Sequence, residues 1–131
     1  MLVQRLVVNN STPIEAVFNE VAAGSSLEIG LYFEDETAPG SGIYEPMSFD
    51  DVTFQSKVRA APSDTAVLAD LTVTPRAGEP GWVDFFLSAV DTLAIGERNV
   101  HWACKMIPDT APERARVIVA GMIPIRWRAT R

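Results

Sequence analysis

Residues 53–59 read Thr-Phe-Gln-Ser-Lys-Val-Arg, and this stretch indicates the fold class. Phe54, Ser56 and Val58 alternate with polar or charged residues, a period of two that is typical of a strand with one face in a core. A surface helix would need apolar residues three and four apart, and that spacing is nearly absent from the chain. The stretch therefore predicts a β-strand near the centre of a sandwich.

Comparable stretches follow one another along the chain. Alternation or an apolar run recurs at residues 27–34, 67–74, 82–87, 99–106 and 115–125. Residues 82–87 carry apolar side chains on both faces, as expected of a strand that is covered twice or contacts a partner. Loops rich in Gly and Pro separate the stretches, at residues 37–42, 75–81 and 108–112.

One short helical turn is expected over residues 88–95. Ser88 can cap its first turn, Asp91 follows three residues later, and Gly96 can end it. This turn would carry the chain from one sheet to the other. Several short strands with no long helix predict an all-β fold built as a sandwich of two antiparallel sheets, with about seven to eight strands.

Length and composition suit one globular unit. The chain has 131 residues, of which 47% are hydrophobic and 21% charged. We expect residues 21–131 to form the sandwich and residues 1–20 to form an N-terminal strand or arm. The apolar runs are too short to cross a bilayer, and no secretory signal is recognisable. We therefore expect synthesis in the host cytoplasm and no membrane partner.

The charges are unevenly distributed. The net charge is −6, with acidic side chains concentrated in residues 1–50 and an excess of basic ones in residues 101–131. Nucleic-acid binding depends on neutralising phosphates, so we expect no nucleic-acid partner. The pattern favours packing between copies, with an acidic face of one copy on a basic edge of another. Charges placed only for solubility are the alternative interpretation.

The order of features from Phe49 onward resembles a known family. The segments that carry the resemblance are Phe49-Asp-Asp-Val-Thr-Phe-Gln-Ser-Lys-Val-Arg, Thr65-Ala-Val-Leu-Ala-Asp-Leu-Thr-Val, Gly81-Trp-Val-Asp-Phe-Phe-Leu-Ser, Asp91-Thr-Leu-Ala-Ile-Gly, Val100-His-Trp and Gly121-Met-Ile-Pro-Ile-Arg. Over residues 20–131 the chain looks like the immunoglobulin-like sandwich domain of tailed-bacteriophage structural proteins. It is similar to the N-terminal domain of the baseplate upper protein and to small stand-alone phage or prophage proteins.

The resemblance implies attachment rather than catalysis. It implies a non-enzymatic structural protein of the virion that docks to the capsid as a decoration or cement protein, with a tail, collar, baseplate or fibre adaptor as the alternative. The partners would be other virion proteins and further copies of the chain. No active site and no cofactor are implied. Residues 1–23 and 45–49 depart from the family pattern, so the docking site is not implied either.

Both ends of the chain are candidate interfaces. Arg126, Trp127 and Arg128 place an aromatic ring between two arginines, a combination enriched at protein interfaces. A Trp127 that closes the core is the alternative. The N-terminal segment would either pair with a neighbouring chain or form the first strand of its own sandwich. Its apolar candidates are Leu2, Val3, Leu6, Val7, Ile14 and Phe18.

The side chains capable of chemistry form no catalytic pattern. His101 is the only histidine, and no nucleophile or carboxylate stands at a catalytic spacing from it. Cys104 shares a strand face with Trp102 and Met106, which predicts a buried and inert thiol. We therefore expect no enzyme activity.

The sequence contains two candidate ligand sites. The acidic residues that could surround a calcium ion match no EF-hand loop, so we expect a solvated acidic loop and no metal. These residues are Glu34, Asp35, Glu36, Asp50 and Asp51. A carbohydrate- or ligand-binding module is a further alternative function. Its aromatic platform would consist of Trp82, Trp102 and Tyr44.

Overall fold

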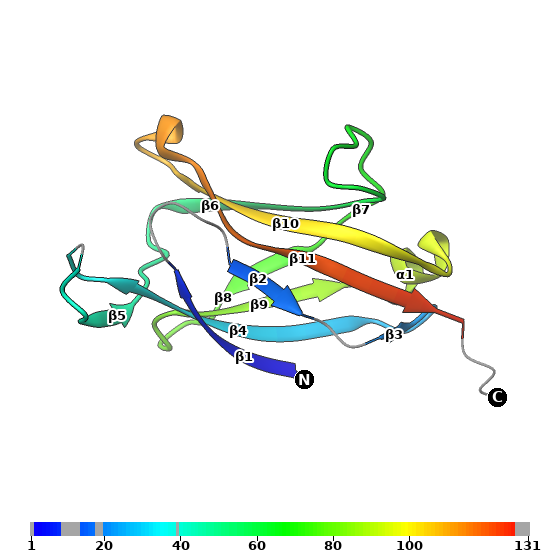
Figure 1. Ribbon diagram of the computed structural model, residues 1–131, viewed down its shortest axis with the longest axis horizontal. Coiled ribbons are helices and arrows are strands. Elements are labelled where there is room, and N and C mark those ends of the chain that lie inside the picture. Colours follow the sequence, from blue (N-terminus) through cyan, green and yellow to red (C-terminus); the bar gives the residue numbers. More distant parts are fainter. Residues whose placement is uncertain (1, 9–13, 18–19, 39, 128–131) are drawn as a thin grey trace.

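The chain folds into two β-sheets packed face to face. The computed structural model describes residues 20–38 and 40–127 in full and the backbone of residues 2–8 and 14–17. Within these ranges one short helix and one 3-10 turn accompany the two sheets (Figure 1). The prediction of an all-β sandwich is confirmed.

The first sheet has β4 and β9 at its centre. Its strands lie in the order β1 (Leu2–Val8), β4 (Leu27–Glu36), β9 (Trp82–Leu87) and β8 (Thr72–Pro75). A short strand, β5 (Tyr44–Pro46), pairs with the far end of β4 and forms a hairpin with it. β1 runs parallel to β4, with Leu2 opposite Ile29. The other pairings are antiparallel.

The second sheet contains the two longest strands. Its strands lie in the order β2 (Ile14–Val17), β11 (Arg116–Arg126), β10 (Arg98–Pro108), β6 (Val52–Arg59) and β7 (Ala69–Asp70). A two-residue strand, β3 (Val21–Ala22), also pairs with β11, next to β2. β2 and β3 run parallel to β11, and the other pairings are antiparallel.

The strand pattern differs from the expected one in three respects. The described residues contain eleven strand segments rather than seven or eight, because the N-terminal part supplies three pieces and β5 a further one. Three pairings are parallel, since β1, β2 and β3 are joined to their partners by connections long enough to return the chain to the same end. β6 lies beside the short edge strand β7 rather than at the centre.

The stretch expected as one strand at residues 67–74 instead changes sheets. Ala69 pairs with β6 in the second sheet, whereas Thr72 pairs with β9 in the first. Leu71 lies between them, is buried, and donates its backbone N–H to the carbonyl of Ser56 at 2.9 Å. The chain thus crosses the sandwich at Leu71.

The core lies between the sheets and is apolar and well packed. The ring of Phe85 on β9 meets the indole of Trp102 on β10 edge to face, with 5.3 Å between the ring centroids. This contact joins the two sheets near the middle of the core. The other largest fully buried side chains are Phe33, Ile29, Leu31, Leu87, Ile118, Ile123, Ile125, Val58, Val83 and Val100.

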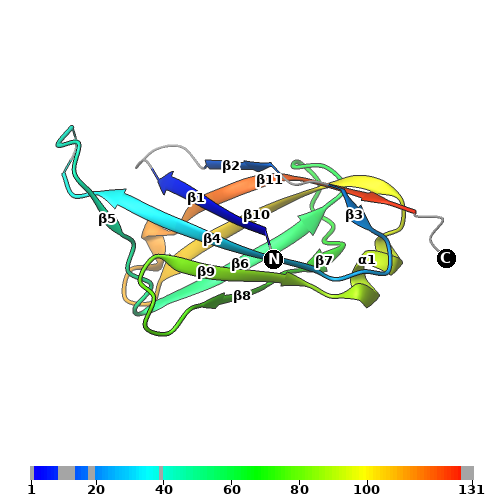
Figure 2. The same cartoon turned by 90° about the horizontal axis from the view of Figure 1, so that it is seen from below.

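The expected helical turn is confirmed as α1 (Ala89–Ile95). The Ser88 hydroxyl oxygen accepts a hydrogen bond from the backbone N–H of Asp91, and Gly96 ends the helix with a φ of 75°. The buried hydroxyl of Thr92 donates to the carbonyl of Ser25, which ties α1 to the turn before β4. α1 carries the chain from β9 to β10, and therefore from one sheet to the other (Figure 2).

Candidate docking surfaces

The N-terminal candidates belong to strands that pair within their own chain. Leu2, Val3, Leu6 and Val7 lie on β1, whose backbone occupies the edge of β4, and Ile14 lies on β2 beside β11. Phe18 lies outside the described residues. In this structure the N-terminal segment thus completes the edges of both sheets.

The C-terminal candidates lie at the surface. Trp127 is 55% exposed, so it does not close the core, and its backbone N–H donates to the Glu97 carboxylate at 2.9 Å. Arg126 donates from its guanidinium to the side-chain oxygen of Asn99 at 2.7 Å. Arg128 lies outside the described residues. Trp127 remains available as a contact residue.

The outer face of the second sheet carries basic and apolar side chains in adjacent rows. Lys57, Arg59 and Lys105 point outward from β6 and β10, and Lys57 contacts Asp70 on β7 at 3.5 Å. His101 stands opposite Arg59 on one side and Met122 on the other. We call this surface the basic face and define it by these three cations, His101 and Met122.

A small hollow lies within the basic face. It holds about 90 Å³ and is lined by Lys57, Arg59, Pro62, His101, Trp102 and Ala103. Met122 is 43% exposed, which is high for a large apolar side chain on a strand. The face thus offers an apolar contact area flanked by positive charge.

The hairpin of β4 and β5 projects from one end of the molecule (Figures 1 and 2). Ile43 is 64% exposed and Tyr44 42% exposed, and Glu45 is exposed beside them. We call these three residues the hairpin tip. The tip therefore combines apolar and negatively charged side chains on a protruding element.

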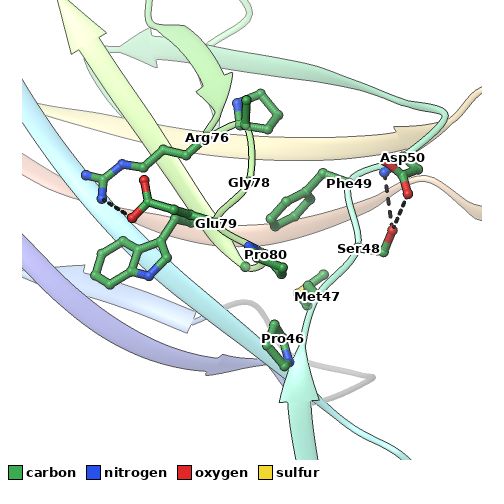
Figure 3. Close-up of a pocket in the computed structure, with 13 residues that line it drawn as sticks. Pro46, Met47, Ser48, Phe49, Asp50, Arg76, Gly78, Glu79 and Pro80 are labelled. Atoms are coloured by element: carbon green, nitrogen blue, oxygen red, sulfur yellow. Dashed lines mark hydrogen bonds and ion pairs between the residues drawn. The ribbon is translucent and has the colours of Figure 1, made fainter.

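A second and larger hollow lies between the loop that precedes β9 and the segment after β5 (Figure 3). It holds about 550 Å³. Pro46, Met47 and Phe49 stand on one side of it, and Glu79 and Pro80 on the other. Its walls are mostly apolar, as is common for a small-molecule site.

Among the described residues, Arg76 is the cation that lines this hollow, and it is already engaged. Arg76 donates from its Nε and Nη2 to both oxygens of the Asp84 carboxylate, at 2.7 Å in the shortest contact, and its guanidinium lies 4.7 Å from the centre of the Trp82 ring. The hydrogen bond to Asp84 raises the pKa of Arg76, and burial lowers it by less. Arg76 is thus a structural cation that fixes the β8–β9 loop.

Cys104 and His101 occupy the positions expected from the sequence. Cys104 is fully buried, and this burial raises the pKa of its thiol to about 12. A thiol with so high a pKa is protonated at neutral pH and is a poor nucleophile. His101 is partly exposed on the outer face of the sheet, beside the basic residues rather than beside a carboxylate. The pair does not form a nucleophile and base.

Cys104 should make the protein less stable in alkali. Its thiol has a pKa of about 12 when folded and 9.0 in the reference state. The folded state therefore holds its proton more tightly, and the resulting stability is fully present below pH 9 and is lost as the pH rises towards 12. Between pH 7 and pH 10 we expect a loss on the order of 1 kcal/mol.

Urea unfolding of the native chain and of Cys104→Ala at both pH values measures this loss. The variant lacks the thiol, so its free energy of unfolding should fall less than that of the native chain. If the free energy of unfolding fell equally in the two proteins between pH 7 and pH 10, Cys104 would not be the responsible group.

Three of the acidic residues considered for calcium are engaged separately. Asp35 accepts a hydrogen bond from Arg116 at 3.2 Å, and Glu36 accepts from the backbone N–H groups of Gly40 and Gly42. Tyr32 donates its hydroxyl to Glu34 at 3.2 Å. In the described residues, no three metal-binding side chains lie close enough to hold an ion.

The aromatic platform proposed for a ligand is not present as one surface. Trp102 is buried in the core, Trp82 is half-buried on the outer face of the first sheet, and Tyr44 belongs to the hairpin tip. The prediction of Trp102 as a platform residue was wrong because its strand face points inward.

Comparison with known proteins does not assign the chain to a family. No protein-family model matches it, and no curated protein is significantly similar to it. In the described part, no helix is long and apolar enough to cross a membrane.

Proposed function

We propose that the protein is a non-enzymatic docking domain of a bacteriophage particle, bound to the capsid as a decoration or cement protein. A tail, collar, baseplate or fibre adaptor is the alternative within the same class. The sandwich fold agrees with the sequence resemblance to the immunoglobulin-like domains of phage structural proteins. That resemblance supplies the phage context of the proposal.

The observation that carries the docking role is the pair of surfaces on one rigid sandwich. The hairpin tip exposes Ile43 and Tyr44 beside negative charge, and the basic face exposes Met122 in the same cross-strand row as His101 and Arg59. Exposed large apolar side chains grouped with charge are typical of interaction sites rather than of an inert surface. Two such surfaces on one chain suit a protein that bridges components of an assembly.

The test is to find the chain in particles and to count it. Particles from a lysate of the strain that encodes the chain are separated on a density gradient, and the chain is quantified against the major shell protein by mass spectrometry. We expect it to sediment with intact particles at a copy number comparable to that of the shell protein. A few copies per particle would favour the adaptor role, and its absence from all particle fractions would refute both roles.

A ligand-binding module is the second candidate, on the single observation of the hollow in Figure 3. Thermal-shift and titration experiments with a set of oligosaccharides would test it. Binding that is lost in a Pro80→Trp variant, which fills the hollow from an exposed position, would support this function. Failure of every oligosaccharide to bind would reject the carbohydrate form of it.

A further inference from the structure

The hairpin tip has the properties of a binding element. Ile43 continues the ladder of β4 and β5, because the backbone N–H of Thr37 donates to its carbonyl at 2.9 Å. Side chains alternate along a strand, so Ile43 and Glu45 lie on the same side of the hairpin and Tyr44 on the other. An exposed aliphatic side chain and a carboxylate therefore stand together at the end of the molecule.

Hydrogen bonds within the chain hold the hairpin on either side of its turn. The Glu36 carboxylate accepts hydrogen bonds from the backbone N–H groups of Gly40 and Gly42, both at 3.0 Å. The Ser41 hydroxyl oxygen accepts from the backbone N–H of Ile43 at 3.2 Å. A contact made by a segment that its own hydrogen bonds constrain loses less conformational entropy on binding than one made by an unconstrained segment. The internal bonds of the loop thus favour its use as an anchor.

The basic face is complementary to this tip. Arg59 and Lys105 on the basic face form no ion pair with other described residues, and neither does Glu45 at the hairpin tip. Ala103, two residues before Lys105 on β10, lines the hollow of about 90 Å³ together with Arg59. Met122 adds apolar surface in the row of His101 and Arg59. The apolar side chain of the tip and its carboxylate each have a counterpart on this face.

The geometry points to head-to-tail binding between copies, in which the hairpin tip of one copy docks on the basic face of the next. The tip projects from one end, whereas β6, β10 and β11 present their outer face along the side of the sandwich, so one copy does not satisfy its own tip (Figure 1). A contact between two different surfaces of identical chains builds a ring or an open chain. This inference rests on the proposed function and identifies a second copy of the chain as the partner of the hairpin tip and of the basic face.

Charge exchange tests the contact. Sedimentation velocity of the native chain from micromolar to millimolar concentration should show self-association that weakens at high salt. Glu45→Lys and Lys105→Glu should each weaken it at least about tenfold, because each variant sets like charges against each other. An equimolar mixture of the two variants should associate again, since the lysine of one then meets the glutamate of the other.

Two further variants separate the contact from general effects of charge and folding. Glu28→Lys makes the same charge change as Glu45→Lys on the exposed outer face of the first sheet and should associate like the native chain. Ile43→Ser should weaken association at least about tenfold, since Ile43 is the apolar anchor. Recovery in the mixture also demonstrates that both charge variants are folded.

Three results would overturn the inference: a native chain that stays monomeric at millimolar concentration, charge variants that associate like it, or a mixture that does not recover. The particle gradient is independent of this experiment. A chain that is present in particles but monomeric in solution would remove the head-to-tail contact alone. A chain that self-associates but is absent from particles would remove the proposed function alone.

Discussion

Replacing Phe85 with alanine should lower the free energy of unfolding by about 3–5 kcal/mol. Phe85 is only 1% exposed and meets Trp102 of the opposite sheet edge to face. Its removal would leave a cavity where β9 faces β10, and a rigid two-sheet core does not collapse to fill it. Urea unfolding followed by tryptophan fluorescence would measure the change.

The adjacent residue supplies the control. Phe86 has the same side chain but is 40% exposed on the outer face of the first sheet, opposite Glu28. Phe86→Ala should lower the free energy of unfolding by only about 1–2 kcal/mol, because Phe86 is partly exposed and its removal leaves no enclosed cavity. Equal losses for the two variants would mean that the inward and outward faces of β9 are wrongly assigned.

Gly81→Ala should lower the free energy of unfolding by about 3 kcal/mol, from left-handed backbone strain and steric overlap together. Gly81 has a φ of 84°, and a Cβ there would lie 2.8 Å from the Phe33 carbonyl oxygen and 2.7 Å from a ring carbon of Tyr32. The Gly81 carbonyl accepts from the backbone N–H of Phe33 at 2.8 Å, so this glycine cannot move away without breaking that hydrogen bond.

Gly78 separates the two causes. It has a similar φ of 75°, but a Cβ there would meet nothing within 4 Å. Gly78→Ala should therefore lower the free energy of unfolding by only about 1–2 kcal/mol, from backbone strain alone. Thermal and urea unfolding of both variants would measure the difference, and equal losses would show that the approach of Gly81 to Phe33 does not matter for stability.

The fold class could be predicted because alternation reports burial directly. Leu27, Ile29, Leu31 and Phe33 are all buried, as their spacing predicts. The same alternation failed to predict the change of sheets at Leu71. A side chain that points inward from either sheet enters the same core, so the period of two continues across the crossing. Alternation encodes which side faces the core, and not which sheet a residue joins.

The docking surfaces were harder to predict because they depend on strand order. Lys57 and Lys105 each occupy the outward side of a strand, which the sequence indicates. Their proximity follows only from the pairing of β6 with β10, which no local pattern encodes. The hairpin tip had a local signal in Ile43 and Tyr44 after Gly42. From the sequence, Tyr44 was predicted only as part of an aromatic platform.

The parallel pairing of β2 with β11 gives the domain a preferred direction of mechanical resistance. A force that pulls the segment entering β2 away from the segment leaving β11 acts along both strands in opposite senses. Every hydrogen bond between them is then loaded at the same time, instead of opening one after another from an end. Resistance to such a pull is governed by the rate of unfolding. A load applied across these two strands would instead separate them bond by bond, so the orientation in which the domain is anchored decides how much tension it withstands.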